Sequence, residues 1–351
     1  MRRPTTARPS RLPEPPLYLR HPSSLEHDPR ALSPEHPDVP ERITAIEAAL
    51  AADGWRGCER RDAPAATTQE LELVHSPAHV RFIQGLAAAG GGRIDDDTYV
   101  GAVSYEAARH AAGGACELAR ALMSGRGSGF AGLRPAGHHA GRDHAMGFCL
   151  FNNVAVAAAL AIEELGAKRV AIVDWDVHHG NGTAELFRRR SDVLYASIHQ
   201  ARLFPGTGEA ADMGSEAGRG YTVNIPVPKG SDDQLWISVL EHVIVPVLLE
   251  FEPRLVLISA GFDAHSADPL GGCLLEAESF AQMACHVRDA AAAVKAPVGA
   301  VLEGGYDPPA LAESVTATIA ALGGEGEAES IAPDPLITGR AAAHVGHYWS
   351  L

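Results

Sequence analysis

Cysteines are few in this 351-residue chain, and their spacing contains no Cys-x-x-Cys pair. An odd number of scattered cysteines indicates neither a disulfide framework nor a cysteine-based zinc knuckle. Because disulfides are rare in reducing compartments, we expect a cytoplasmic protein. The cysteines are Cys58, Cys116, Cys149, Cys273 and Cys285.

Long apolar segments are also missing. No uninterrupted apolar run reaches the roughly 18 residues that cross a bilayer, so we expect no membrane association. The N-terminus has prolines and arginines but no apolar stretch after its positive charges, which argues against a secretory signal. We interpret residues 1–17 as a flexible Pro/Arg-rich arm, with a tag-like or partner-binding role as the alternative, and residues 18–351 as the folded domain.

Basic residues are outnumbered, with 29 Lys and Arg against 44 Asp and Glu and a formal net charge of −15. A negative chain repels phosphate backbones, so we expect no direct binding of nucleic acid. The charge suits either the attraction of cationic substrates, such as amines and lysine-rich peptides, or solubility alone. The 46% of hydrophobic residues and 21% of charged residues argue against a disordered or fibrous chain.

Four short apolar runs are typical of strands buried on both faces of a parallel sheet. Segments with helical spacing lie between them, and strands that alternate with helices predict helices on both faces of such a sheet. We therefore expect an α/β fold. The runs are 169–173, 193–197, 255–259 and 298–302, and the helical segments are 154–164, 235–249 and 279–293.

Polar side chains that carry chemistry follow each of these runs. They occur in Asp174–His179, Ser197–His199, Ala260–Asp263 and Glu303–Tyr306. Open parallel sheets gather their ligands at the carboxyl ends of the strands. The sequence therefore predicts one functional site at that edge.

Asp176 and His178 are two residues apart just beyond a strand, where alternation points both side chains the same way. Asp263 follows another strand and can approach them. Two carboxylates and one imidazole suit a catalytic zinc with an open position for water, or iron(II) as the alternative. Taken alone, the Asp-x-Asp-x-His stretch is also compatible with a helix cap.

His138 and His139 are adjacent, which suits an acid/base pair because imidazole titrates near neutral pH. They are also compatible with a surface pair or with part of a metal site. Tyr306 follows two glycines that permit a tight turn, so its phenol could donate to an oxyanion. A buried core tyrosine is the alternative.

Eight motifs follow one another along the chain: HPDVPER (36–42), RPAGHHAG (134–141), GFCLFNN (147–153), DWDVHHGNGT (174–183), FPGTG (204–208), SAGFDA (259–264), DPLGG (268–272) and LEGGY (302–306). With these motifs the chain resembles the histone deacetylase family, specifically its class II-like branch with the bacterial histone deacetylase-like amidohydrolases. The resemblance runs from about residue 18 to about residue 322 and implies an arginase/deacetylase-like single domain.

The resemblance also implies a role for each matching residue. The zinc ligands fall on Asp176, His178 and Asp263. The catalytic positions are His138, His139, Tyr306 and Asp174, the last of which supports the histidine pair. The substrate-binding positions are Gly147, whose carbonyl holds the amide N–H, Phe148 and Phe204, which form the walls of an acyl-lysine tunnel, and Leu270 at its rim.

Structural potassium or sodium ions are a further implication. One ion would use Asp174, Ser197 and the backbone carbonyls of Asp176, His178 and Ile198. A second ion would use mostly backbone oxygens, from Phe187, Arg190, Val193 and Tyr221. Arg42 matches a residue beside an internal acetate exit channel.

The sequence departs from class I members at Asn181, where they have an aspartate. Class II-like relatives share the asparagine, so it assigns a branch. Without that charge, His139 should be less readily protonated. The segment Ser104–Ala108 lacks the family stretches that grip the substrate backbone.

These residues predict a zinc-dependent amidohydrolase that removes acetyl or other short acyl groups from acyl-lysine peptides or small N-acyl amines and binds hydroxamate inhibitors. One alternative is an acetylpolyamine deacetylase, although Leu270 offers no charge for a distant ammonium. Another is a catalytically silent acyl-binding or repressor-type module, although every catalytic position is filled. A manganese arginase would need more carboxylates for its two-metal site.

Overall fold

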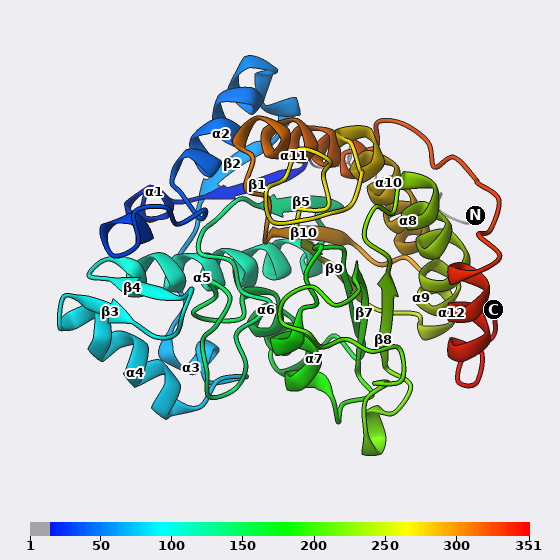
Figure 1. Cartoon of the computed structure of the whole chain (residues 1–351), viewed down its shortest axis with the longest axis horizontal. Helices are drawn as coiled ribbons and strands as arrows, with labels where there is room; N and C mark the ends of the chain where they lie inside the picture. Colours follow the sequence, from blue (N-terminus) through cyan, green and yellow to red (C-terminus); the bar gives the residue numbers. More distant parts are fainter. Residues whose placement is uncertain (1–14) are drawn as a thin grey trace, which may run out of the picture.

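Eight parallel strands form the centre of the protein in a computed structural model, which describes residues 15–351 (Figure 1). Most of the predicted arm, residues 1–14, lies outside the described residues. Leu17 was assigned to the arm, but it is the first residue of β1 and is fully buried. It pairs with Glu59 on one side and Gly129 on the other, so the folded chain starts before the predicted boundary.

The sheet is doubly wound, with its earliest strands at one side. Every neighbouring pair is parallel, as the α/β prediction requires. The order is β2 (Glu59–Asp62), β1 (Leu17–Arg20), β5 (Ser128–Ala131), β10 (Val298–Leu302), β9 (Leu255–Ala260), β6 (Val170–Asp174), β7 (Val193–Gln200) and β8 (Thr222–Val227). A separate antiparallel pair joins β3 (Gly91–Arg93) to β4 (Tyr99–Gly101).

Helices cover both faces of the sheet (Figure 1). On one face α5 (Ser104–Met123) packs against α6 (Asn153–Glu163). On the other lie α2 (Glu41–Ala52), α10 (Ala277–Ala293), α11 (Pro308–Leu322) and the continuous stretch α8 (Asp233–Val239), η4 (Leu240–Ile244) and α9 (Val245–Phe251). The remaining helices are α1 (Ser23–Glu26), η1 (Pro29–Ala31), η2 (Gly54–Gly57), α3 (Thr68–Leu71), α4 (Pro77–Ala88), α7 (Asn181–Phe187), η3 (Glu216–Gly218) and α12 (Ile337–Val345).

The strand β6 shows why its sequence is continuously apolar. Val170 and Ile172 belong to the core on the α5–α6 face, whereas Ala171 and Val173 belong to the core on the opposite face. Successive side chains of a strand point to opposite faces, and here both faces are buried. The predicted run is therefore confirmed as a central strand.

One helical stretch, Asp233–Phe251, is long and apolar enough to cross a membrane by length and composition. In the structure, 56% of its most apolar window is buried inside the protein. Trp236, Leu240 and Val247 are among the side chains that it contributes to the core on the face of the sheet covered by α2, α10 and α11. This packing accounts for its hydropathy.

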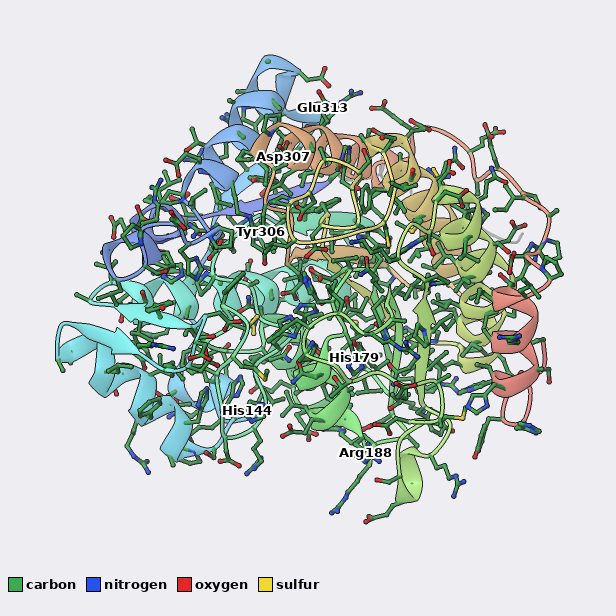
Figure 2. The ribbon with its side chains drawn as sticks, viewed as in Figure 1. His144, His179, Arg188, Tyr306, Asp307 and Glu313 are labelled. Atoms are coloured by element: carbon green, nitrogen blue, oxygen red, sulfur yellow. The ribbon has the colours of Figure 1, made fainter. Side chains whose placement is uncertain are left out.

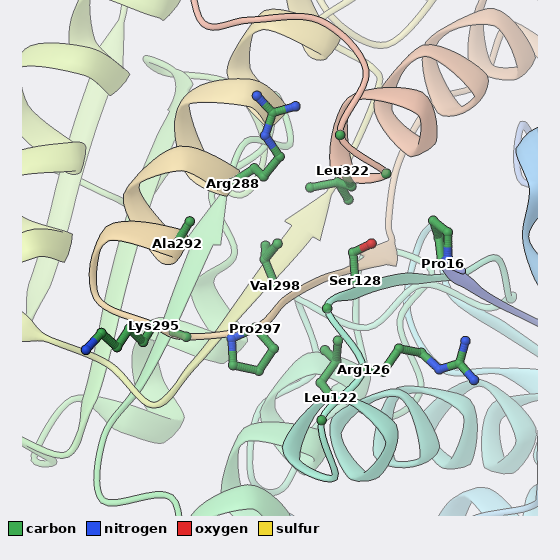
Figure 3. Close-up of a pocket in the computed structure, with 15 residues that line it drawn as sticks. Pro16, Leu122, Arg126, Ser128, Arg288, Ala292, Lys295, Pro297, Val298 and Leu322 are labelled. Atoms are coloured by element: carbon green, nitrogen blue, oxygen red, sulfur yellow. The ribbon is translucent and has the colours of Figure 1, made fainter. Parts of the chain in front are cut away.

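A hollow of about 490 Å³ lies at the amino ends of β5 and β10 (Figure 3). The charged residues that line it are cationic: Arg126, Arg288 and Lys295. Arg288 Nη1 donates to the carbonyl oxygen of Ala321, in the last turn of α11, at 2.8 Å. Cations stabilise the negative end of a helix dipole, which explains this arginine structurally. The predicted site lies at the opposite, carboxyl ends of the strands.

Candidate active site

Three buried ligand groups meet just beyond the carboxyl ends of β6 and β9. Nδ1 of His178 lies 3.1 Å from Oδ1 of Asp176 and 2.9 Å from Oδ2 of Asp263. One ligand atom from each residue lies within 4.8 Å of the others. Asp176 and Asp263 are fully buried and His178 is 8% exposed. The structure thus brings the predicted triad together, and two carboxylates with one imidazole fit a divalent metal such as zinc.

Backbone groups hold the carboxylate oxygens of this triad in place. Oδ2 of Asp176 accepts a hydrogen bond from Gly304 N at 2.8 Å, and Oδ1 of Asp263 accepts one from Val177 N at 2.8 Å. A Cβ at Gly304 would clash with both carboxylates, so this position requires glycine.

The ionisation of the triad favours a bound cation. Burial and the nearby Asp176 raise the pKa of Asp263 to about 7. Burial alone would lower the pKa of His178, but the carboxylates of Asp263 and Asp176 raise it to about 10. Two buried carboxylates so close together repel each other unless positive charge lies between them. The protonated ring of His178 supplies that charge, and a metal ion bound to the neutral ring would take the place of its proton.

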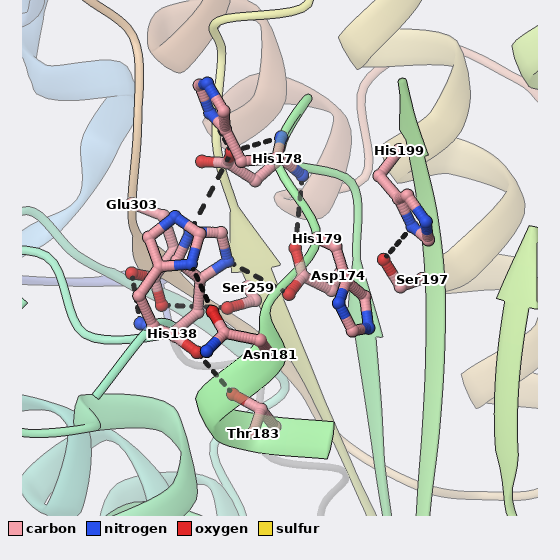
Figure 4. Close-up of polar contacts among 12 residues, drawn as sticks. His138, Asp174, His178, His179, Asn181, Thr183, Ser197, His199, Ser259 and Glu303 are labelled. Atoms are coloured by element: carbon pink, nitrogen blue, oxygen red, sulfur yellow. Dashed lines mark hydrogen bonds and ion pairs between the residues drawn. The ribbon is translucent and has the colours of Figure 1, made fainter. Parts of the chain in front are cut away.

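The two adjacent histidines lie beside the triad, with Nε2 of His138 3.8 Å from Oδ1 of Asp176 and the ring centroid of His139 6.1 Å from that of His178. Figure 4 shows His138 next to Asp174. Their ring centroids are 4.0 Å apart. Nδ1 of His138 lies 3.2 Å from Oδ2 of Asp174, and Nδ1 of His139 lies 2.8 Å from Oδ1 of Asn181. Each histidine thus has a different partner, one charged and one neutral.

That difference separates their protonation states. Burial alone would lower the pKa of His138, but Asp176 and Asp174 raise it to about 10. Burial and the neighbouring His138 and His178 hold the pKa of His139 well below its usual range. At neutral pH His138 is therefore charged and His139 is neutral.

Tyr306 lies in the loop between β10 and α11 (Figure 2). Its backbone N–H donates to Oδ2 of Asp268 at 2.6 Å, and the guanidinium of Arg42 lies 4.7 Å from its ring centroid. Burial keeps the pKa of Tyr306 well above its usual value. The phenol is therefore a hydrogen-bond donor at neutral pH.

A cavity of about 240 Å³ leads to His139, His178 and Tyr306. Phe148 packs edge-on against Tyr306 at a centroid distance of 5.7 Å, and Phe204 packs edge-on against His139 at 5.1 Å. Such a narrow, mostly apolar slot fits a linear alkyl chain. Its lining also includes Gly147, Leu203, Leu270 and Asp97.

Comparison with known proteins identifies the family. The model of the histone deacetylase domain matches residues 36–322. This chain belongs to the histone deacetylase family. Histone deacetylase 15 of Arabidopsis thaliana is 43% identical over 313 residues, which are 87% of this chain and 56% of that protein. The crystal structure of the HDA15 HD domain superposes with a TM-score of 0.88 at 38% identity and covers 95% of each chain.

Microbial relatives are similar to the same extent. A histone deacetylase-like amidohydrolase of Pseudomonas aeruginosa is 39% identical over 259 residues, 73% of this chain and 68% of that protein. A probable deacetylase of Methanothermobacter thermautotrophicus is 43% identical over 271 residues, 76% of this chain and 80% of that protein. This family member thus shares the arginase/deacetylase-like fold that its sequence predicts.

Two further residues, Asp97 and Glu303, lie at the site of this family member without an individual role predicted from the sequence. Asp97, in the turn between β3 and β4, lines the mouth of the cavity. Glu303, directly after β10, is fully buried behind the histidine pair. The sequence signal for Asp97 was the run of three aspartates at 95–97, and for Glu303 it was a carboxylate beside two glycines.

The motif His36–Arg42 supports the site from behind. The ring of His36 packs on Phe148 at a centroid distance of 4.5 Å. Arg42 donates to the carbonyl oxygens of Glu303 and Gly305, both at 2.5 Å. These contacts anchor a tunnel wall and the tyrosine loop. Arg42 therefore holds the backbone of the tyrosine loop, in addition to the place beside an exit channel that the resemblance predicts for it.

Proposed function

We propose that this chain is a zinc-dependent amidohydrolase that removes acetyl or short acyl groups from acyl-lysine. One observation carries the proposal: a narrow apolar cavity leads to a buried metal triad, a histidine pair and a tyrosine. The named deacetylases among the relatives support the same reaction.

Asp176, His178 and Asp263 would hold the metal ion. When bound, zinc polarises the acyl carbonyl and lowers the pKa of the attacking water. Iron(II) fits the same two carboxylates and one imidazole and is the alternative. The buried carboxylates support either cation.

His139 acts as the general base, because its low pKa keeps it neutral and able to accept a proton from water at neutral pH. It then returns this proton to the leaving amine, which is too basic to depart without it. His138 remains charged beside Asp174 and stabilises the developing negative charge. Tyr306 donates a hydrogen bond to the oxyanion.

The cavity walls support a linear acyl-lysine as the substrate, with Phe148 and Phe204 along the alkyl chain, Leu270 at the rim and the carbonyl of Gly147 accepting the substrate amide N–H. Asp97 places a carboxylate at the mouth. There it can accept backbone N–H groups of a peptide or pair with the distant ammonium of an acetylpolyamine. This second possibility keeps acetylpolyamines as the alternative substrates.

A monovalent cation beside the histidine pair is part of the proposal. Asp174, the last residue of β6, pairs in register with Ser197 inside β7, which supports the predicted potassium or sodium site. At the second predicted site, the carbonyl oxygens of Phe187 and Tyr221 each accept one backbone hydrogen bond and retain a second lone pair. We keep the cytoplasm as the proposed location.

The test is a substrate panel with zinc-loaded protein: acetyl-lysine and trifluoroacetyl-lysine peptides, and acetylated polyamines. We expect the highest kcat/KM for the peptides and inhibition by a linear hydroxamate. A higher kcat/KM for acetylated polyamines would show that they, and not acyl-lysine peptides, are the substrate class. Absence of turnover throughout the panel would favour a silent acyl-binding module.

A further inference from the structure

Glu303 is a buried carboxylate that the proposed mechanism does not use. It follows β10 directly and is fully buried. Its Oε2 accepts hydrogen bonds from Gly137 N at 2.7 Å and His138 N at 3.1 Å. Its Oε1 accepts one from Ser259 Oγ at 2.8 Å (Figure 4). The carboxylate thus joins the ends of β9 and β10 to the loop that carries the histidine pair.

The same loop is held through its carbonyl groups from the other side. Thr183 N donates to the carbonyl oxygen of His138 at 3.1 Å, and Nδ2 of Asn152 donates to that of Ala140 at 3.1 Å. The backbone N–H groups of the loop therefore donate to Glu303, whereas its backbone carbonyl oxygens accept from Asn152 and Thr183. Removing the carboxylate would leave two neighbouring N–H groups buried without an acceptor, which is costly.

We propose that Glu303 is a positioning residue, whose paired hydrogen bonds to Gly137 and His138 hold the histidine pair in register with the metal triad. The proposal rests on the proposed function of that site. Glu303 acts through the loop backbone, since its side chain accepts hydrogen bonds from the backbone N–H groups of Gly137 and His138 and from Ser259 Oγ. The histidines need this support because a misplacement of about 1 Å can cost roughly 10²-fold in rate.

Glutamine is the decisive substitution. Glu303→Gln can place its carbonyl oxygen at the two N–H groups and its amide N–H at Ser259 Oγ, so that all three hydrogen bonds persist without the charge. We expect its kcat to stay within about fivefold of wild type. Glu303→Ala removes every bond, and we expect kcat to fall roughly 10²-fold with KM within about twofold.

Two controls separate positioning from general damage. Zinc content, measured by elemental analysis, should stay at the wild-type level in both variants, because Glu303 does not contact the triad through its side chain. Leu50→Ala, in the α2 core, supplies a variant with a lowered melting temperature and an intact site. Its kcat should remain that of wild type at a temperature where it is folded.

If Glu303→Ala does not fold, Glu303→Asp replaces it. Aspartate keeps the charge but is one methylene shorter, so it cannot reach all three donors. We expect its kcat to lie below that of the glutamine variant but to fall by less than roughly 10²-fold from wild type. Full activity of folded Glu303→Ala or Glu303→Asp overturns the proposal, as does a Glu303→Gln variant as slow as alanine. Failure of the proposed function itself is distinct, because wild-type protein would then turn over no substrate in the panel.

Discussion

Replacing Tyr306 by phenylalanine isolates one hydroxyl group of the site. The ring would keep its contacts with Arg42, at 4.7 Å, and with Phe148, at 5.7 Å. Within residues 15–351 the hydroxyl group makes no hydrogen bond, whereas the backbone N–H is bound to Asp268. The substitution therefore removes a donor that faces the cavity and leaves the packing intact.

The expected effect follows from that geometry. Loss of one oxyanion donor typically lowers kcat by roughly 10²–10³-fold, or about 2.7–4 kcal/mol of transition-state stabilisation. KM should change little, because the bond to Tyr306 forms mainly in the transition state. Since no protein hydrogen bond is lost, we expect the free energy of unfolding to change by less than about 0.5 kcal/mol.

The assay combines steady-state kinetics on an acetyl-lysine peptide with thermal unfolding of the same preparation. Tyr348→Phe is the matched control, because its hydroxyl accepts a hydrogen bond from Arg219 far from the cavity. We expect this control to keep the wild-type kcat. A Tyr306→Phe enzyme with wild-type kcat would refute the oxyanion role and most of the mechanism.

Three other predictions test the remaining components of the site. Asp263→Ala should abolish both bound zinc and activity, and full zinc occupancy by elemental analysis would contradict its assignment as a ligand. Asn181→Asp should raise the pKa of His139. Because the base must be neutral, the acid limb of the pH–kcat/KM profile should then move to higher pH. An acid limb at the wild-type pH would count against His139 as the base. A saturating linear hydroxamate should abolish turnover of acetyl-lysine, and unchanged turnover would contradict the cavity or the metal placement.

Four adjacent strands, β6, β7, β9 and β10, could be predicted because both faces of each are buried, whereas the equally buried β5 was not predicted. Predicted runs at 193–197, 255–259 and 298–302 lie within β7, β9 and β10, and 169–173 is offset from β6 by one residue. The outer strand β2 escaped prediction because its four residues, Glu59–Asp62, are all charged and half of them are exposed. Its pairing with β1 determines the strand, and residue composition does not reveal that pairing.

The grouping of the proposed metal triad could be predicted because Asp176 and His178 lie two residues apart after β6, and Asp263 follows β9, whose carboxyl end lies at the same edge of the sheet. The role of Glu303 could not, since its partner Gly137 lies 166 residues away. The resemblance implies which positions carry the proposed function, but the contacts that support them are set by how distant loops pack. Asp97 could not be predicted for the same reason, because it lines the cavity together with Phe148 and Leu270, which are distant from it in sequence.

The loop after β10 explains how one short segment can coordinate the whole site. Glu303 binds the loop of the histidine pair, Gly304 N binds the ligand Asp176, and the carbonyl of Gly305 accepts from Arg42. Tyr306 then enters the cavity. Four consecutive residues thus contact four different parts of the site: the loop of the histidine pair, Asp176, Arg42 and the cavity. The glycines permit this density, because a Cβ at Gly304 would clash with the carboxylates of Asp176 and Asp263 and Gly305 has a φ of 117°. The loop therefore contacts the histidine pair, the proposed metal triad and the cavity through separate residues, so that a substitution at Glu303 can shift the histidine pair while the contact of Gly304 with Asp176 persists.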